Sequence, residues 1–340
     1  MSDFMHEQVI VRRGARSGAP IIVAVHSTAL GQAIGGCRIK PYPDWRDGLT
    51  DALRLSAAMS EKCALAGLPN GGGKTVVALT SDTDRRDALL DVGDVIAALG
   101  GAYATGPDVG TSPDDMAVIA GRTPHVFCRP VSAGGSGDSS EATAIGVVAA
   151  LQAVAQDRFG SADLTRRTFA LLGLGRVGTH VFRMLSATGA RLVAADVDPT
   201  RKALAGSSWV SPEQCLTAEV DILVPAALGG LLTPQSVPAL RCAAVVGPAN
   251  NQLDDPSTAV LLHDRGILWA PDVIVSAGGI IHATAVELRH ESPAQVTARL
   301  HAIGGTLTEI LHQARASGTT PASAAASAAH SRFSSHRTIQ

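Results

Sequence analysis

The segment Phe169-Ala-Leu-Leu-Gly-Leu-Gly-Arg-Val-Gly178 decides the fold of the second half of this chain. Its apolar run stops at Gly173, and Gly175 and Gly178 complete the order G-x-G-x-x-G where a helical pattern begins. Glycines at these places permit a tight turn, let a pyrophosphate approach backbone N–H groups at the helix N-terminus, and let the helix lie close to the strand. We therefore predict a strand, a nucleotide-binding turn and a helix; chance glycines in an ordinary turn are the alternative.

Short apolar runs and helical patterns alternate along the chain around this segment. The runs that we expect to form strands lie at residues 168–172, 191–195, 222–224, 243–246, 267–270 and 273–275. Helical patterns lie at residues 177–188 and near Pro212. Strands separated by helices are typical of a parallel, doubly wound sheet of the Rossmann type, so we expect such a sheet here.

The expected strand at residues 191–195 is followed by an acid, Asp196, 18 residues after Gly178. A carboxylate at this place can bind both hydroxyls of a ribose and repels a 2′-phosphate. We therefore predict NAD rather than NADP as the cofactor, although Arg201 nearby could soften that preference.

The chain is longer than one hydrophobic core usually supports, and its charges nearly balance. Its 340 residues exceed the roughly 250–300 at which cores tend to split, so we expect two domains. A net charge of −2 argues against nucleic acid or a membrane surface as a partner. The Ser- and Gly-rich stretch 132–140 is the most linker-like, and we place the boundary there. We expect the first domain at residues 1–135 with a C-terminal helix at about 290–325, and the second domain at residues 136–289.

The cysteines are odd in number and scattered, and none has zinc-ligand spacing: Cys37, Cys63, Cys128, Cys215 and Cys242. We therefore expect no metal site, and reduced thiols of the kind found in cytosolic proteins. The N-terminus has no signal-peptide pattern, and no stretch of about 18 uncharged apolar residues occurs. Together these features predict a cytoplasmic protein.

The first half is expected to begin with a strand pair at residues 8–12 and 20–26, which are rich in β-branched side chains. We interpret residues 30–38 as a Gly-rich connector and residues 47–62 as a helix. The remaining expected elements are a strand at 75–79, a helix at 85–99, a loop at 103–112, a helix from Pro113, and helices at 141–156 and 297–316. Residues 317–340 have no core pattern, so we expect them to fray.

Two lysines bracket a glycine run in Met59-Ser-Glu-Lys-Cys-Ala-Leu-Ala-Gly-Leu-Pro-Asn-Gly-Gly-Gly-Lys74. Backbone without Cβ atoms lets a small ligand come close to Lys74. A second cation such as Lys62, together with burial, would lower the pKa of an amine and leave a neutral base near neutral pH. A Gly-rich turn with a solvated lysine is the alternative.

Several motifs follow one another in a specific order. They are Gly35-Gly36-Cys37-Arg38, Met59-x-x-Lys62, Leu68-Pro-Asn-Gly-Gly-Gly-Lys74, Thr105-Gly-Pro-Asp-Val-Gly110, Gly137-Asp-Ser-Ser140, Thr143-Ala-x-Gly-Val147, the G-x-G-x-x-G segment, Gly247-Pro-Ala-Asn-Asn251 and Ala277-Gly-Gly279. With this set, the chain resembles the family of glutamate, leucine, valine and phenylalanine dehydrogenases from about residue 31 to about residue 311. The likeness to the leucine, valine and phenylalanine members is the closer.

The resemblance implies an NAD-dependent enzyme that oxidatively deaminates an L-amino acid to a 2-oxo acid and ammonia, and catalyses the reverse reaction. It also implies an α/β fold with two domains, an N-terminal α/β substrate domain and a Rossmann-type NAD domain, with a catalytic cleft between them. Related enzymes are homo-oligomers with N-terminal strands at the subunit contact, so we expect the same.

The resemblance also implies roles for single residues. Lys62 would hold the substrate α-carboxylate, Lys74 would be the catalytic amine, and Asp108 would exchange protons with the substrate amino group. Further residues expected to contact the substrate are Gly35, Gly36, Asn250 and Asn251. Residues expected to contact the cofactor are Thr143, Gly173, Gly175, Arg176, Val177, Gly178, Asp196, Ala226, Ala227 and Asn251.

The chemistry requires these residue types independently. Hydride leaves Cα only from a neutral amine, so a base must first remove a proton, and a carboxylate substrate needs a fixed cation. Asp108 has two competitors, Asp114 and Asp115, but acids at a helix start have an ordinary structural role.

The sequence departs from the family pattern at two places. Ser276 replaces the asparagine usual before Ala-Gly-Gly, and we expect altered cofactor contacts there. Ala226 replaces a cysteine, and we expect that change to affect packing only.

The signals for the substrate side chain conflict. Glutamate-specific relatives carry a lysine where this chain has Ile34, and an unpaired carboxylate against an apolar wall would be costly. Gly106-Pro107 resembles phenylalanine dehydrogenases and would leave room near the reacting centre, whereas Gly137-Asp-Ser-Ser140 and Asn251-Gln-Leu253 resemble valine and leucine members. We expect a bulky apolar side chain, aromatic slightly ahead of branched aliphatic, with mixed specificity plausible because a few methylenes change binding by only about 1–3 kcal/mol.

Two other classes of function compete with this interpretation. Gly73-Lys74-Thr75 resembles the end of a phosphate-binding P-loop, but the first glycine of that motif is Leu68 here. A non-catalytic nucleotide-sensing protein on the same fold is the second alternative, suggested by Ser276. Lys62, Lys74 and Asp108 argue against it.

Overall fold

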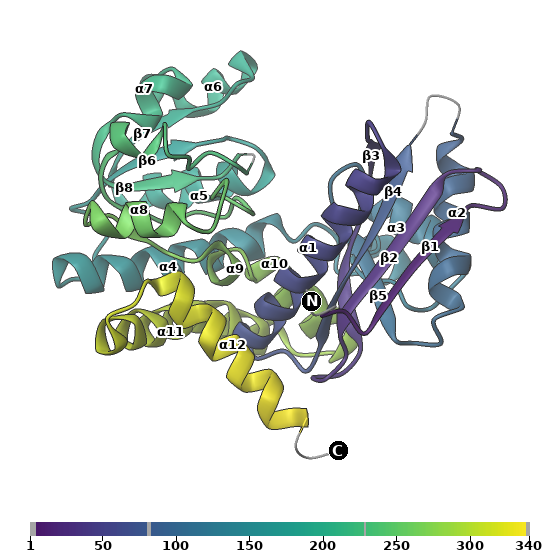
Figure 1. The fold of residues 1–340 in the computed structure, drawn as a ribbon. Helices are drawn as coiled ribbons and strands as arrows, with labels where there is room; N and C mark the ends of the chain where they lie inside the picture. Colours follow the sequence, from purple (N-terminus) through teal and green to yellow (C-terminus); the bar gives the residue numbers. More distant parts are fainter. Residues whose placement is uncertain (1–4, 80–82, 228, 338–340) are drawn as a thin grey trace. The chain divides into compact units, whose positions relative to one another are not determined.

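A computed structural model describes residues 5–79, 83–227 and 229–337. The chain forms two compact units, each with its own sheet (Figure 1). Unit 1 comprises Met1–Asp138, Ala283–Glu291 and Ala329–Gln340, and unit 2 comprises Ser139–His282 and Ser292–Ala328. Among the described residues, no helix is long and apolar enough to cross a bilayer.

Unit 1 contains a five-stranded mixed sheet in the order β1-β2-β4-β3-β5. Its strands are β1 (Gln8–Arg13), β2 (Pro20–Ser27), β3 (Ala33–Pro41), β4 (Gly71–Leu79) and β5 (Tyr103–Pro107). The pairs β1/β2 and β2/β4 are antiparallel, whereas β3 is parallel to both β4 and β5. The predicted strand pair at the N-terminus is confirmed.

Helices cover both faces of this sheet. They are α1 (Trp45–Leu65), α2 (Arg85–Ala97) and α3 (Pro113–Ala120). Helix α1 packs across β4 and β2, where Ala52 meets Ile22 and Val76 in one apolar cluster (Figure 1). The opposite face buries side chains of α2 and α3, such as Ile96 and Met116, so β4 and β3 lie in the interior of the unit.

Three glycine-containing segments of unit 1 were expected outside strands, and for them the sequence prediction is wrong. The expected connector at 30–38 contains β3, the glycine run opens β4, and the expected loop at 103–112 contains β5. Glycine usually signals a turn, but here small residues are needed within strands. A Cβ on Gly73 would lie 2.5 Å from the buried ring of Tyr103, so only glycine lets these strands pack.

Unit 2 contains a five-stranded sheet in the order β10-β9-β8-β6-β7, and every pairing is parallel. Its strands are β6 (Thr168–Leu172), β7 (Arg191–Ala195), β8 (Glu219–Pro225), β9 (Arg241–Val245) and β10 (Leu268–Trp269). Its helices are α4 (Ser140–Phe159), α5 (Arg176–Thr188), α6 (Lys202–Ala205), α7 (Pro212–Leu216), α8 (Thr258–Asp264), α9 (Asp272–Val275) and α11 (Pro293–Ser317). The predicted parallel, doubly wound sheet is confirmed.

The end of the chain differs from the sequence prediction. Residues 273–275 lie in helix α9 instead of a strand. Residues expected to fray form α12 (Pro321–Arg337), whose buried side chains include Ala324 and Ala325. Alanines bury little area each and give no strong apolar period, which explains the missed helix. Helix α10 (Gly278–Ala283) and a π-helical turn (Thr284–Leu288) precede α11.

Helix α11 belongs to unit 2, whereas the sequence analysis assigned a C-terminal helix at about 290–325 to the first domain. The physical reason is small residues at the contact between α11 and α4. A Cβ on Gly146 of α4 would lie 2.4 Å from Cδ1 of Ile303, and a Cβ on Gly304 would lie 2.8 Å from the carbonyl oxygen of Ala149. The two helices therefore pack backbone to backbone.

Candidate functional site

Unit 1 pairs the two residues that were expected to be catalytic. Lys74 lies in the interior strand β4, and Asp108 follows the last residue of β5. The Nζ atom of Lys74 lies 2.7 Å from Oδ2 of Asp108, and only 6% of the lysine side chain is exposed. This is a buried amine beside a carboxylate, held by two strands of one sheet.

Gly36 provides the floor of this site. It pairs with Gly106 of β5 and lies beside Lys74 of the neighbouring strand. A Cβ on Gly36 would lie 2.7 Å from Cβ of Asp108 and 3.2 Å from Nζ of Lys74. Any side chain would therefore fill the space next to the amine and carboxylate. Gly35 serves packing instead, because its Cβ would lie 1.8 Å from the carbonyl oxygen of Gly73.

A second cation, Arg38, also reaches Asp108. Its Nε atom donates to Oδ2 of Asp108 at 2.8 Å. Burial alone would raise the pKa of Asp108, but the positive charges of Lys74 and Arg38 outweigh burial and lower that pKa to about 2. Asp108 is therefore a carboxylate throughout the neutral pH range. Arg38 ends the Gly35-Gly36-Cys37-Arg38 motif, but no role was predicted for it, because the direction of a side chain in an expected connector does not follow from local sequence.

Lys62 lies in the last turn of α1 and is partly buried. The helix that carries it passes directly over the glycine run, since a Cβ on Gly72 would lie 2.1 Å from the backbone nitrogen of Ser60. The fold therefore places the helix that carries Lys62 against the strand that carries Lys74.

The two competing acids have structural roles. Asp115 accepts hydrogen bonds from the backbone nitrogen of Ser112 at 2.8 Å and from its hydroxyl at 2.9 Å, and it pairs with Arg85 at 2.7 Å. Asp114 lies beside it in the first turn of α3. Acids at this place cap the helix, and their negative charge interacts favourably with the positive end of the helix dipole.

The space beside Gly106 is already filled by protein. A Cβ on Gly106 would lie 2.4 Å from Cε2 of Phe127, whose side chain is buried. Gly106 therefore makes room for the Phe127 ring, and the expectation that it opens space for a substrate is wrong. No pattern in the sequence marked Phe127, because it lies outside regular elements.

Unit 2 builds the predicted turn between β6 and α5. A Cβ on Gly173 would lie 2.6 Å from the backbone nitrogen of Ala227, and a Cβ on Gly178 would lie 2.0 Å from the carbonyl oxygen of Gly173. Ala226 packs against the same turn, 3.3 Å from the Cβ position of Gly178. These residues therefore need to be small, as predicted for a turn that presents backbone to a ligand.

The start of α5 suits a dinucleotide. Gly175 is the N-cap, Arg176 and Val177 are the first two helical residues, and no side chain of the described chain caps this helix. A Cβ on Gly175 would meet no described atom within 4 Å, so space lies directly in front of the turn. A helix start without a side-chain cap and this open space fit a pyrophosphate.

Asp196 supports the turn directly. Its Oδ2 atom accepts from the backbone nitrogen of Leu174 at 2.6 Å, and its Oδ1 atom accepts from that of Asp198 at 2.9 Å. The carboxylate is partly exposed and fixed in direction, at the end of β7. It can therefore both orient the glycine turn and present an oxygen to a ribose.

Ser276 contacts one of the predicted asparagines. Its hydroxyl donates to the carbonyl oxygen of Asp272 at 2.6 Å and lies 3.2 Å from Oδ1 of Asn250. Asn251 has a positive φ of 53°, which asparagine tolerates better than most residues. Thr143 donates to the carbonyl oxygen of Ser139 at 3.0 Å, within the first turn of α4.

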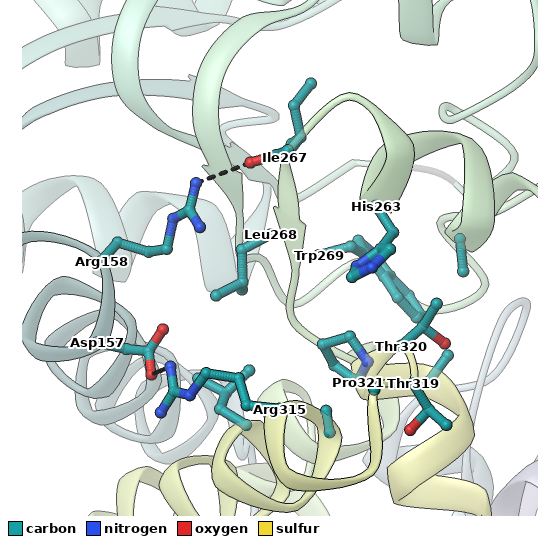
Figure 2. Close-up of a pocket in the computed structure, with 16 residues that line it drawn as sticks. Asp157, Arg158, His263, Ile267, Leu268, Trp269, Arg315, Thr319, Thr320 and Pro321 are labelled. Atoms are coloured by element: carbon teal, nitrogen blue, oxygen red, sulfur yellow. Dashed lines mark hydrogen bonds and ion pairs between the residues drawn. The ribbon is translucent and has the colours of Figure 1, made fainter.

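Unit 2 also contains a cavity of about 330 Å³ that none of the predicted residues lines. Figure 2 shows Trp269 and Leu268 of β10 on one side and Pro321 of α12 on another, with Asp157 paired to Arg315 at the rim. Within the described ranges, no group of three His, Cys, Asp or Glu side chains could hold a metal ion. The five cysteines are free thiols.

Comparisons with known proteins show which family this chain is similar to. Residues 5–125 match the family profile described as "Glu/Leu/Phe/Val dehydrogenase, dimerisation domain", and residues 134–199 and 196–337 match "Glutamate/Leucine/Phenylalanine/Valine dehydrogenase". The phenylalanine dehydrogenase of Lysinibacillus sphaericus is 40% identical over 319 residues, covering 91% of this chain and 84% of that protein. The valine dehydrogenase of Streptomyces coelicolor is 39% identical over 342 residues, covering 98% and 93%. The crystal structure of L-tryptophan dehydrogenase from Nostoc punctiforme matches with a TM-score of 0.84 and 34% identity, covering 98% of this chain and 97% of that one.

Proposed function

Because this chain belongs to the Glu/Leu/Phe/Val dehydrogenase family, an amino acid dehydrogenase family that uses NAD(P), we propose that it catalyses the reversible NAD-dependent oxidative deamination of a bulky apolar L-amino acid. The products are a 2-oxo acid and ammonia. The observation that carries the proposal is the Lys74–Asp108 pair on the Gly36 floor.

Three side chains of unit 1 act on the substrate. Lys62 holds the α-carboxylate as a fixed cation. Lys74 takes a proton from the water that attacks the imino carbon of the oxidised substrate. In the reverse direction, its ammonium form polarises the carbonyl oxygen of the 2-oxo acid. Asp108, ionised at neutral pH, accepts hydrogen bonds from the substrate amino group and exchanges protons with it.

The G-x-G-x-x-G turn of unit 2 binds the cofactor, and the backbone amides at the start of α5 hold its pyrophosphate. NAD held there would supply the hydride acceptor for the substrate Cα. Asp196 accepts from the ribose hydroxyls and disfavours a 2′-phosphate, which supports NAD over NADP. Thr143, Asn250 and Asn251 hold the nicotinamide side, and Asn251 also contacts the substrate.

Ile34 supports a substrate with an apolar side chain. It is fully buried next to Gly35 and Gly36 in β3, and it offers no charge to a carboxylate on the substrate side chain. An aromatic side chain is slightly favoured, since similar proteins are named phenylalanine and tryptophan dehydrogenases. A branched aliphatic substrate is the alternative, since a valine dehydrogenase is almost equally similar.

The proposed enzyme is a homo-oligomer in the cytoplasm. The profile matched by residues 5–125 is described as a dimerisation domain, and β1 is an edge strand of the unit 1 sheet. An edge strand offers unpaired backbone groups to a second copy. The free thiols support a reducing compartment.

The test is an NADH-oxidation assay with ammonia and a panel of 2-oxo acids: phenylpyruvate, indolepyruvate, 4-methyl-2-oxopentanoate, 3-methyl-2-oxobutanoate and 2-oxoglutarate. We expect turnover of bulky apolar 2-oxo acids and little of 2-oxoglutarate. Cofactor binding without turnover of any of them would favour a nucleotide-sensing protein instead.

A further inference from the structure

We propose that Arg38 is a positioning residue of this site, which fixes one carboxylate oxygen of Asp108 and leaves the other directed to the substrate amino group. The inference rests on the proposed deamination. It assigns a task to a side chain that itself need not touch the substrate.

The geometry separates the two oxygens of Asp108. Nε of Arg38 and Nζ of Lys74 both meet Oδ2, at 2.8 Å and 2.7 Å. Within the part of the chain that the structure describes, no group donates a hydrogen bond to Oδ1. One oxygen is therefore occupied by two cations, and the other can accept from an amine.

Arg38 is itself held firmly. Its NH1 group donates to Oδ2 of Asp51 at 2.8 Å, and only 14% of the arginine side chain and 15% of the aspartate side chain are exposed. Asp51 also accepts from the hydroxyl of Tyr42 at 2.8 Å and pairs with Arg54 at 2.9 Å. An ion pair that is mostly buried and fixed at both ends holds its partner more rigidly than an exposed one.

The charges alternate along this chain of contacts. Lys74 comes from β4, Arg38 from β3 and Asp51 from α1, with Lys40 of β3 4.0 Å from Asp51 and Arg54 beside it. When Lys74 gives up its proton during the reaction, Arg38 still neutralises Asp108. Without Arg38, the carboxylate would contact Lys74 alone, and the pKa of Asp108 would rise because one of its two neighbouring cations is gone.

The first test is the rate of deamination by Arg38→Gln and Arg38→Lys. For Arg38→Gln we expect kcat to fall roughly 10- to 100-fold, because the carboxylate of Asp108 is no longer held in place. Arg38→Lys should restore part of the rate, and added guanidinium ions should partly rescue Arg38→Ala. Arg46→Gln, which loses an exposed pair with Asp44, should leave kcat unchanged.

The second test does not depend on turnover. The carboxyl carbon of Asp108, assigned by its loss in Asp108→Asn, is followed by ¹³C NMR while the pH is lowered from 7 to about 2, the pKa of this carboxyl. In Arg38→Gln we expect it to titrate at a higher pH than in the unmodified protein. An unmoved titration, or an unchanged kcat, would overturn the role of Arg38. A moved titration in a protein that turns over no 2-oxo acid would contradict the proposed function and leave the role of Arg38 intact.

Discussion

Replacing Gly36 by alanine tests the glycine floor of the site most sharply. The added Cβ would lie 2.7 Å from Cβ of Asp108, 3.1 Å from the carbonyl oxygen of Pro107 and 3.2 Å from Nζ of Lys74. Carbon atoms at rest lie about 3.5–4.0 Å apart, so the end of β5 must move by about 1 Å. Cβ of Asp108 and the carbonyl oxygen of Pro107 are not at the far end of a flexible side chain, so they cannot move aside without the backbone.

A displacement of about 1 Å at reacting groups costs about 100-fold in rate, so we expect kcat/KM to fall by at least that factor. Overpacking a rigid site should lower the free energy of unfolding by about 1–3 kcal/mol. The assays are NADH oxidation with ammonia and a bulky apolar 2-oxo acid, and urea unfolding of the same preparation.

Gly305→Ala is the matched control. It lies in α11, and a Cβ there would meet no described atom within 4 Å. It should keep full activity and raise the free energy of unfolding by up to about 1 kcal/mol, because alanine favours helix over glycine. A Gly36→Ala protein with normal kcat/KM would show that the space beside Lys74 and Asp108 does not depend on the absence of a Cβ at residue 36.

The remaining predictions concern the cofactor and acid stability. Asp196→Asn keeps an acceptor for the backbone of Leu174 but removes the charge, so the preference for NADH over NADPH should fall about tenfold, which corresponds to about 1.4 kcal/mol. Asp198→Asn is the control variant. An unmodified enzyme that prefers NADPH would contradict the role of Asp196 in selecting NAD. The pKa of Asp108 is about 2, against its ordinary 3.8, so its ion pairs should contribute about 2 kcal/mol above pH 4, a stability that is lost as the pH falls from 4 to 2. The difference in unfolding free energy between the unmodified protein and Asp108→Asn should therefore shrink over that range in urea titrations, and a constant difference would argue against the pairing.

Unit 2 was predictable from sequence because its strands are buried on both faces. Strand β6 is an apolar run after Thr168, β8 is apolar from Ile222 onward, and the turn after β6 carries its own glycine signature. Helix α11 was expected in the first domain but lies in unit 2, because its partner α4 contributes small residues that give no amphipathic pattern.

Unit 1 was less predictable because its strands β3 and β4 contain the residues that usually mark turns. Gly36 and Gly73 lie in strands only because Asp108 and Tyr103 occupy the places of their side chains, which local sequence does not show. Lys74 was proposed from the glycine run before it, and Asp108 from the family motifs. No role was predicted for Arg38, although it is part of a motif, and Phe127 was not singled out, because the directions of both side chains depend on pairing between distant segments.

The most direct test of the central claim, that the buried amine of Lys74 performs the chemistry, is the kcat of Lys74→Ala together with its affinity for NADH. Because a proton-transfer group is worth roughly 10²–10⁴-fold, we expect kcat to fall at least about 100-fold. The Kd for NADH should stay unchanged, since the dinucleotide turn belongs to unit 2. As a control, Arg46→Ala, which removes an exposed cation of α1, should retain activity. A Lys74→Ala enzyme with near-normal kcat would contradict the account.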